Sequence, residues 1–185
     1  MSVNRPRERF ESLAALVYEP LQRYARRRTD AETAADVVAE SLTVLWRRLD
    51  DVPPGNELAW SYGVARRCLA NARRSARRGT ALVERLESAA RTSAPAVESR
   101  ADEELWEALD QLRPDDREVL RLWAWEQLTP AEIALVMELT PNATSIRLHR
   151  AKARLAELLT ARKDAEGPGH RPDAAHESTG EEAGT

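Results

Sequence analysis

Two helix-start signals in close succession constrain this chain more than any other feature of its sequence. They lie in TPAEIALVMELTPNATSIRLHRAKARLAELL, residues 129–159. Thr129 is a good N-cap, a proline follows it at the first helical position, and Glu132 completes a capping box. Thr140 with a second proline repeats the signal, and apolar residues at helical spacing follow it. The sequence therefore predicts two helices joined by a few residues, which is the pattern of a helix-turn-helix.

The second of these helices is predicted to have an apolar face and a polar face. Its inward positions are Thr144, Leu148, Ala151 and Leu155. The candidate DNA-contacting residues are the cap Thr140 and the outward or flanking residues Asn142, Ser145, Ile146, Arg147, His149, Arg150, Lys152 and Arg154. Side chains of these kinds can reach base edges and phosphates in a major groove. The alternative is an ordinary helical hairpin whose polar face is only solvated.

Composition indicates an all-α protein made of two small helical domains. Ala, Leu, Arg and Glu dominate the 185 residues, glycine is scarce, and β-branched runs are absent. The single cysteine, Cys68, excludes an internal disulfide and a cysteine-rich metal site. No secretory segment opens the chain and no apolar run could span a bilayer. We therefore expect a cytoplasmic protein without membrane contact of its own.

The net charge of −3 conceals a partition of charge along the chain. Residues 1–78 hold 15 Lys and Arg against 10 Asp and Glu, and residues 114–163 hold 8 against 7. The acidic excess lies in residues 79–113, with 4 against 8, and in residues 164–185, with 1 against 6. The average charge is therefore no argument against a nucleic-acid partner for the basic segments.

Apolar residues at helical spacing predict a first helix over residues 7–28, which ends in the three arginines Arg26, Arg27 and Arg28. Basic residues suit a helix C-terminus because they complement the helix dipole. We therefore interpret these arginines as a solvated helix end rather than as DNA contacts.

A second predicted helix, over about residues 31–49 and capped by Asp30, carries a candidate docking surface. Its buried stripe is predicted to be Val38, Leu42, Leu45 and Leu49, and the opposite stripe is Asp36, Glu40, Thr43 and Arg47. Two carboxylates one turn apart on an exposed face repel each other slightly, so helix stability explains them poorly. They could dock on a basic partner surface, or they could form a merely solubilising face.

A loop with two prolines and a glycine, residues 50–57, ends that helix, and a third helix is predicted over residues 58–78. The only charged residues of this third helix are Arg66, Arg67, Arg73, Arg74, Arg77 and Arg78. Six positive charges without a carboxylate indicate a polyanion partner. Trp60, Asn71 and two of the arginines fall on one side, a combination that suits the bases and phosphates of a single strand. We nevertheless prefer to interpret Trp60 as a core residue.

The rest of the chain is predicted to hold a linker, a second domain and a tail. Periodicity is lost over residues 79–100, which indicates a flexible linker. Two helices then precede the helix-turn-helix and complete a four-helix domain over residues 101–161. In this domain Trp106 and Trp123 are expected in the core, whereas Trp125 is left open. Residues 162–185, rich in glycine, proline and acid, are expected to be a disordered tail.

The order of these parts resembles the extracytoplasmic-function sigma factors, the small two-domain class of sigma subunits of bacterial RNA polymerase. The matching stretches are ADVVAESLTVLWRRL (35–49), AWSYGVARRCLANARRSARR (59–78), LRPDDREVLRLWAWEQLTPAEIALVM (112–137) and TPNATSIRLHRAKARL (140–155). All four stretches in this order form a highly specific pattern. The resemblance implies a transcription initiation factor that is no enzyme, needs no cofactor or metal, and has an anti-sigma protein as a partner.

The resemblance also implies roles for individual residues. The acidic face of the second helix would dock on the clamp coiled coil of the polymerase β′ subunit through Asp36, Glu40 and Arg47, and the β flap would be a further contact. The melted −10 element would be bound by Asn56, Trp60, Arg66, Arg67, Asn71, Arg73 and Arg74. The −35 element would be read as duplex by Thr140, Asn142, Ser145, Ile146, Arg147, His149 and Arg150.

Several positions depart from the family pattern. An apolar residue usually occupies the position of Thr144, and a glycine often ends the first helix of the motif, where Glu138 stands. Arg67 replaces a usual asparagine, and Ala39 replaces a usual glutamine. The alternative function is a stand-alone helix-turn-helix regulator with an N-terminal effector or dimerisation domain. The six-arginine helix argues against it, because an effector-binding module would not need those charges.

Overall fold

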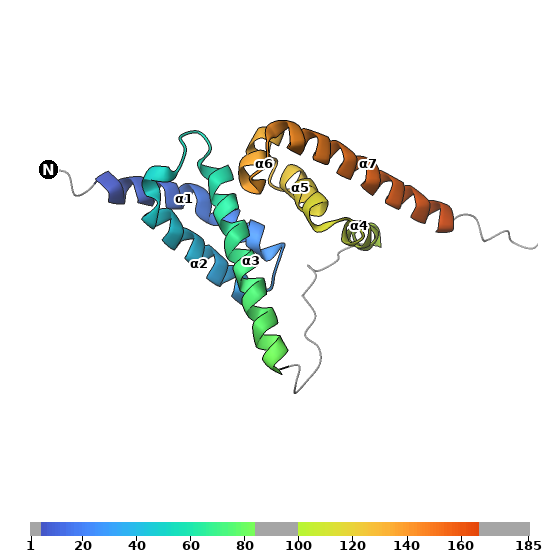
Figure 1. The fold of residues 1–185 in the computed structure, drawn as a ribbon, viewed down its shortest axis with the longest axis horizontal. Coiled ribbons are helices and arrows are strands. Elements are labelled where there is room, and N and C mark those ends of the chain that lie inside the picture. Colours follow the sequence, from blue (N-terminus) through green and yellow to red (C-terminus); the bar gives the residue numbers. More distant parts are fainter. Residues whose placement is uncertain (1–4, 84–99, 167–185) are drawn as a thin grey trace, which may run out of the picture.

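The computed structural model describes residues 5–83 and 100–166. Within these ranges the chain is helical and contains no strand, as the sequence predicts. The elements are α1 (Arg5–Arg26), α2 (Ala31–Arg47), the short 3-10 helix η1 (Leu49–Asp51), α3 (Glu57–Val83), α4 (Arg100–Asp110), α5 (Pro114–Ala124), α6 (Pro130–Met137) and α7 (Pro141–Glu166). Figure 1 shows α1 to α3 on one side of the molecule and α4 to α7 on the other.

Helices α1, α2 and α3 pack on one another, and we call them the N-terminal bundle. Helix α1 buries the stripe Leu13, Val17, Leu21 and Tyr24, whose spacing places them on one face. Asp30 caps α2, since its Oδ1 accepts a hydrogen bond of 2.9 Å from the backbone N–H of Thr33. The predicted stripe of α2 is correct for Val38, Leu45 and Leu49, although Leu42 is only half-buried and Leu49 lies in η1.

Helices α4 to α7 form the C-terminal bundle, in which α6 and α7 make the predicted helix-turn-helix. Thr129 and Glu132 form a complete capping box at the start of α6. Thr140 caps α7 by accepting a 3.2 Å hydrogen bond from the backbone N–H of Ala143. Glu138 ends α6 with a φ of 57°, in the left-handed region that favours glycine. The residue that departs from the family pattern therefore occupies a strained backbone position.

The inward face predicted for α7 is confirmed. Thr144, Leu148 and Ala151 are buried, and Leu155 is half-buried against the core. The Thr144 hydroxyl is fully buried and has no hydrogen-bond partner within the part of the chain that the structure describes. An unpaired buried hydroxyl costs free energy, so the departure at Thr144 also carries a structural cost.

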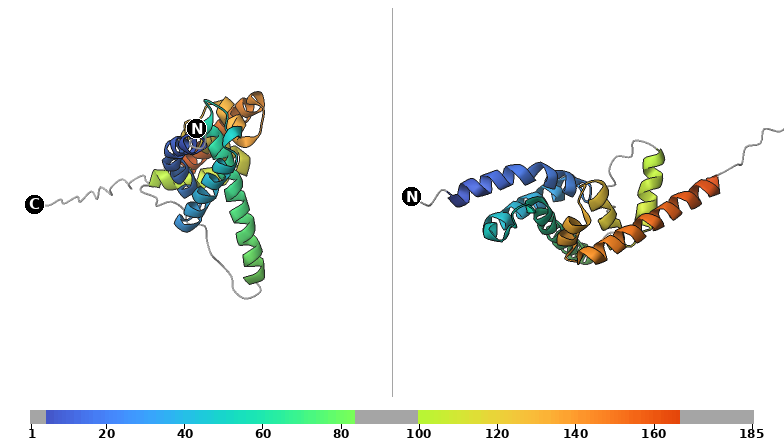
Figure 2. Two further views of the ribbon diagram at one scale, coloured as in Figure 1. Left: turned by 90° about the vertical axis from the view of Figure 1, so that its left-hand side faces the viewer. Right: turned by 90° about the horizontal axis from the view of Figure 1, so that it is seen from above.

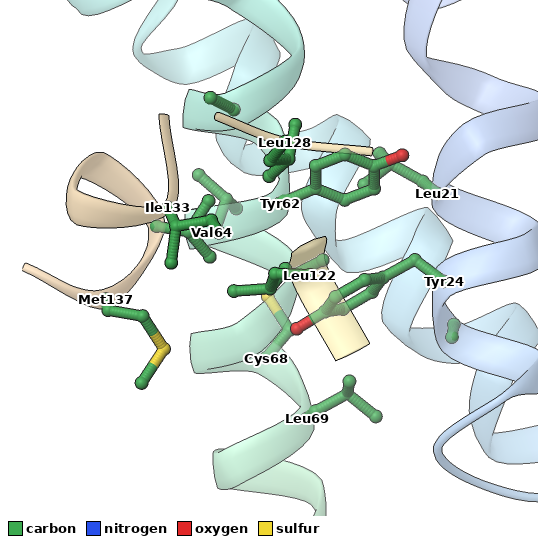
Figure 3. Packing of buried hydrophobic residues seen from close by; sticks show 14 of the residues in the cluster. Leu21, Tyr24, Tyr62, Val64, Cys68, Leu69, Leu122, Leu128, Ile133 and Met137 are labelled. Atoms are coloured by element: carbon green, nitrogen blue, oxygen red, sulfur yellow. The ribbon is translucent and has the colours of Figure 1, made fainter. Parts of the chain in front are cut away.

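The two bundles pack tightly on each other through α3 and α6, a contact that the sequence did not predict. Figure 3 shows Tyr62, Val64 and Cys68 of α3 facing Leu122, Leu128, Ile133 and Met137 of the C-terminal bundle. These side chains are all buried and belong to one continuous core. The views in Figure 2 show α7 extending from this junction away from the N-terminal bundle.

Four predictions are wrong in the structure. Helix α3 continues to Val83, so the first residues of the predicted linker are helical, and α7 continues to Glu166 into the predicted tail. Trp123, expected in the core, is 43% exposed, and the ammonium group of Lys152 lies 3.3 Å from its ring centroid. Arg28, expected at a solvated helix end, is buried. The remaining predicted linker and tail, residues 84–99 and 167–185, lie outside the described residues.

Candidate nucleic-acid interface

Helix α7 presents most of the residues that the sequence assigns to duplex DNA. Asn142, Ser145, Ile146, His149 and Arg150 are all exposed on it, and Thr140 is exposed at its cap. The Ser145 hydroxyl donates a 3.0 Å hydrogen bond to the carbonyl oxygen of Pro141, as serine commonly does within a helix. This face is therefore polar, accessible and not needed by the core.

Arg147 differs from its neighbours on α7 because it is half-buried and ion-paired. Its Nη1 lies 3.1 Å from an Asp115 carboxylate oxygen, and its Nε lies 3.8 Å from Asp116. Both carboxylates belong to the first turn of α5, where acidic residues are stabilised by the helix dipole. The Arg147 guanidinium is thus engaged in ion pairs within the protein in this structure.

The arginines of α3 lie on the exposed side of that helix, and several are also paired. Arg66 Nη2 lies 3.7 Å from Asp115, and Arg67 Nη1 lies 2.8 Å from Glu138. Arg73 donates a 3.1 Å hydrogen bond to the backbone carbonyl of Arg28. The predicted contacts Asn71 and Arg74 are exposed, and Arg74 donates a hydrogen bond to the side chain of Asn71 at 2.6 Å. Arg77 and Arg78, the other two arginines of this helix, are exposed as well.

The predicted contacts Asn56 and Trp60 lie at the start of α3, and both are half-buried. Asn56 is half-buried there, and its backbone N–H donates to the carbonyl oxygen of Pro53 at 3.1 Å. Gly55 has a φ of 80° and donates its N–H to the Glu57 carboxylate at 3.0 Å, a hydrogen bond that lowers the pKa of Glu57. Trp60 packs against the core, and the guanidinium of Arg48 lies 5.5 Å from its ring centroid. The core interpretation of Trp60 therefore fits this arrangement.

The acidic stripe of α2 lies on the surface. Asp36, Glu40 and Arg47 are all exposed on this helix. Trp46, next to Arg47, is 49% exposed and meets the ring of Phe10 edge-on at 5.1 Å between centroids. Exposed carboxylates on one helix face can give electrostatic complementarity to a basic partner surface.

A buried ionic cluster joins the two bundles, and sequence reasoning missed it. We call it the Arg28 cluster: Arg28, Tyr24, Glu118 and Glu126. Arg28 Nε lies 3.1 Å from Glu118, its Nη1 lies 3.1 Å from Glu126, and its guanidinium carbon lies 3.6 Å from the Tyr24 ring centroid. Tyr24 also donates a 3.1 Å hydrogen bond to Glu118. Nothing in the spacing of these residues signals a contact, because the two bundles contribute them from distant parts of the chain.

Ionisation within this cluster follows from its burial and its charges. Burial alone would raise the pKa of the Glu118 carboxyl, but the charge of Arg28 and hydrogen bonds from Arg28 and Tyr24 outweigh it, so that pKa is lowered. Burial, together with the Glu118 charge, raises the pKa of Tyr24 well above its usual value. Arg28 and Glu118 are therefore both charged near neutral pH.

The described helices combine a helix-turn-helix with a second, arginine-rich helix, which defines a DNA-binding factor of the transcription machinery. The family model for sigma-70 region 4 matches residues 102–155. RNA polymerase sigma factor CarQ of Myxococcus xanthus is 30% identical over 158 residues, which span 81% of this chain and 88% of CarQ. The chain therefore belongs to the RNA polymerase sigma factors, in their extracytoplasmic-function class.

Solved structures agree with this assignment. CnrH, in complex with the cytosolic domain of CnrY, is 26% identical with a TM-score of 0.57, and the match covers 82% of this chain and 88% of CnrH. The sigma factor RpoE of Bartonella quintana, in complex with the anti-sigma factor NepR, shares the fold at 24% identity and a TM-score of 0.61, over 82% of this chain and 96% of RpoE. The chain is thus a transcription initiation factor that gives RNA polymerase its promoter specificity, and a stand-alone regulator is not favoured.

Proposed function

We propose that the C-terminal bundle, residues 101–161, reads the −35 element through α7. The support is the exposed polar row of Asn142, Ser145 and Arg150, together with the buried opposite face that fixes the orientation of the helix. Asparagine and arginine can each make two hydrogen bonds to a base edge in the major groove. His149 and the Thr140 cap, which are both exposed, would contact backbone phosphates.

We further propose that the N-terminal bundle, residues 7–78, binds the melted −10 element. The arginines of α3 would neutralise phosphates of the single strand, and Asn56 and Asn71 offer amide groups to bases. The observation that supports this role is the row of exposed arginines along one helix, which no carboxylate of the same helix neutralises between residues 58 and 78. Residues 84–99 would link the two bundles, and residues 167–185 would form an acidic tail.

Polymerase docking is assigned to the acidic stripe of α2. Asp36 and Glu40 would meet a basic surface of the β′ clamp, with Arg47 at the end of the stripe, and the C-terminal bundle would meet the β flap. This assignment explains two neighbouring carboxylates that helix stability does not require. We propose no catalytic activity and no cofactor for this chain. We also propose that it acts in the cytoplasm, because its proposed partners are RNA polymerase and promoter DNA.

An inhibitory protein partner is also part of the proposal. The relative CnrH was solved with the cytosolic domain of CnrY bound to it. We propose that an anti-sigma protein likewise binds this chain and withholds it from polymerase.

Binding to core polymerase tests the proposed docking surface. Asp36→Arg with Glu40→Arg should abolish co-elution with core polymerase while the helical content stays unchanged, because both side chains are exposed. The matched control is Glu11→Arg with Glu19→Arg, since these carboxylates are exposed on α1 and pair only within it. Normal polymerase affinity in the α2 variant, or equal loss in the α1 variant, would refute this docking surface.

A further inference from the structure

A large apolar side chain, Ile146, lies on the otherwise polar face of α7. Ile146 is 44% exposed, whereas Leu148, two residues later, is buried in the core. The other large side chains of this face are polar: Asn142, Ser145, His149 and Arg150. A β-branched isoleucine is also a weaker helix former than alanine. Neither core packing nor helix stability therefore explains an isoleucine at this position.

The rotation of the helix places Ile146 at the centre of the exposed face. Successive residues of an α-helix are rotated by about 100° about its axis. Ile146 therefore points about 160° away from Thr144 and about 160° away from Leu148, in opposite senses. Both of these residues are buried. The side chain of Ile146 is thus directed away from the core.

Ile146 lies between two side chains that are suited to reading bases. Asn142 is one turn before it and Arg150 is one turn after it, and both are exposed. Residues four positions apart are separated by about 6 Å along a helix axis. Base pairs of a duplex are stacked at a spacing of ~3.4 Å. With α7 in the major groove, Ile146 would therefore face a base pair within about two pairs of the one that Asn142 contacts.

The chemistry of isoleucine restricts what Ile146 can recognise in that groove. Its side chain has no hydrogen-bond donor or acceptor, so it cannot read the polar pattern of a base edge. The C5 methyl group of thymine is the apolar group that a base pair presents in the major groove. The polar groups of the other bases would lose water against isoleucine without gaining a hydrogen bond, which costs free energy.

We propose that Ile146 selects a thymine in the −35 element by contact with its C5 methyl group. The inference rests on the proposed reading of this element by α7, and it adds a specificity that hydrogen bonds from Asn142 and Arg150 do not supply. The contact buries one methyl group of the base and part of the exposed isoleucine. Loss of a buried group of this size corresponds to about a fourfold loss of affinity.

Deoxyuridine tests this contact, because it differs from thymidine only in the missing C5 methyl group. Holoenzyme is formed from core polymerase and the full chain, and it selects promoter fragments from a random library. Deoxyuridine then replaces each thymine of the shared −35 element in turn, on either strand. At one position the native holoenzyme should bind the deoxyuridine fragment about fourfold more weakly than the thymine fragment.

Substitutions of Ile146 show whether this side chain causes the difference. Holoenzyme with Ile146→Ala should bind the thymine and deoxyuridine fragments equally at that position, and alanine favours the helix, so α7 should remain folded. Ile146→Val keeps a branched apolar side chain and should retain part of the discrimination. The matched control is Leu16→Ala, which truncates an apolar side chain of α1 that is 54% exposed and should leave the fourfold ratio unchanged.

The ratio of the two affinities separates a methyl contact from other effects. A change of DNA shape caused by deoxyuridine would persist in Ile146→Ala, whereas a lost contact with Ile146 would not. Equal binding of every deoxyuridine fragment by native holoenzyme, an undiminished ratio in Ile146→Ala, or loss of the ratio in Leu16→Ala would overturn the methyl contact. Holoenzyme binding that is indifferent to every base change in the −35 element would overturn the proposed function instead.

Discussion

Replacement of Arg28 by methionine tests how the two bundles are joined. Methionine keeps an unbranched apolar stem but removes the guanidinium that lies between Glu118 and Glu126. The Glu118 carboxylate, which is 16% exposed, would then remain buried without this cation, whereas Glu126, which is 1% exposed, would keep its ion pair of 3.3 Å with Arg27. The matched control is Arg26→Met, because Arg26 is an exposed arginine in the last turn of α1, two residues before Arg28.

The size of the effect follows from the burial of the pair. Removing one partner of a buried ion pair costs about 3–5 kcal/mol, whereas exposed charges contribute below about 1 kcal/mol. Arg28→Met should therefore lower the free energy of unfolding in urea by about 3 kcal/mol or more at pH 7. Adding Glu118→Gln to Arg28→Met should recover most of this loss, since no uncompensated charge remains.

The pH dependence of unfolding gives an independent test of the Arg28 cluster. In the native chain the pKa of Glu118 is lowered by folding. The contribution of Glu118 to the free energy of unfolding is therefore fully present above its pKa in the unfolded chain, about 4.3, and is lost as the pH falls through its pKa in the folded chain. In Arg28→Met burial should raise that pKa, so the variant should gain stability as the pH falls from 7 towards 5. A loss below about 1 kcal/mol at pH 7, or parallel pH profiles for variant and native chain, would refute the structural role of the cluster.

Three further variants test separate parts of the account. Arg73→Ala with Arg74→Ala should weaken DNA binding by holoenzyme at every promoter. The slope of log affinity against log salt concentration should fall by about 0.7 for each single-strand phosphate that the protein no longer neutralises. A changed −35 preference would contradict this assignment. Ser145→Ala should change the free energy of unfolding by no more than about 0.5 kcal/mol. It should cost about 1–3 kcal/mol of base discrimination at one −35 position, measured by binding to a panel of single-base promoter variants. Equal loss of affinity for every promoter variant would contradict base reading by Ser145. Thr144→Val should raise the free energy of unfolding by about 1–2 kcal/mol, because it removes the buried unpaired hydroxyl; a loss of stability would indicate that the hydroxyl has a partner.

The helix-turn-helix was predictable because its signals are local. The Thr129 capping box and the Thr140 cap involve residues within one turn of each other, so the sequence alone specifies both helix starts. The buried face of α7 was predictable for the same reason, as Thr144 and Leu148 are one helical turn apart. The exposure of the candidate DNA contacts follows directly from that face.

The contacts between the bundles were not predictable, because their ion pairs join residues 49 to 99 positions apart. Arg28 follows a helix end, where a solvated arginine is the ordinary expectation, yet it is buried against Glu118. Trp123 shows the opposite error: its apolar character suggested the core, whereas α5 buries its neighbours Leu120 and Leu122 and leaves it on the surface. Periodicity identifies the face of a helix but cannot identify which distant helix covers it.

Reconstituted transcription tests the central claim, that this chain confers promoter specificity on RNA polymerase. Core polymerase, the purified chain and promoter fragments selected from a random library are combined, and run-off transcripts are measured. We predict transcripts only when the chain is present, from fragments that share one −10 and one −35 element, and none with Asp36→Arg and Glu40→Arg. Absence of chain-dependent transcripts, together with tight binding of the chain to a DNA site without polymerase, would contradict the account.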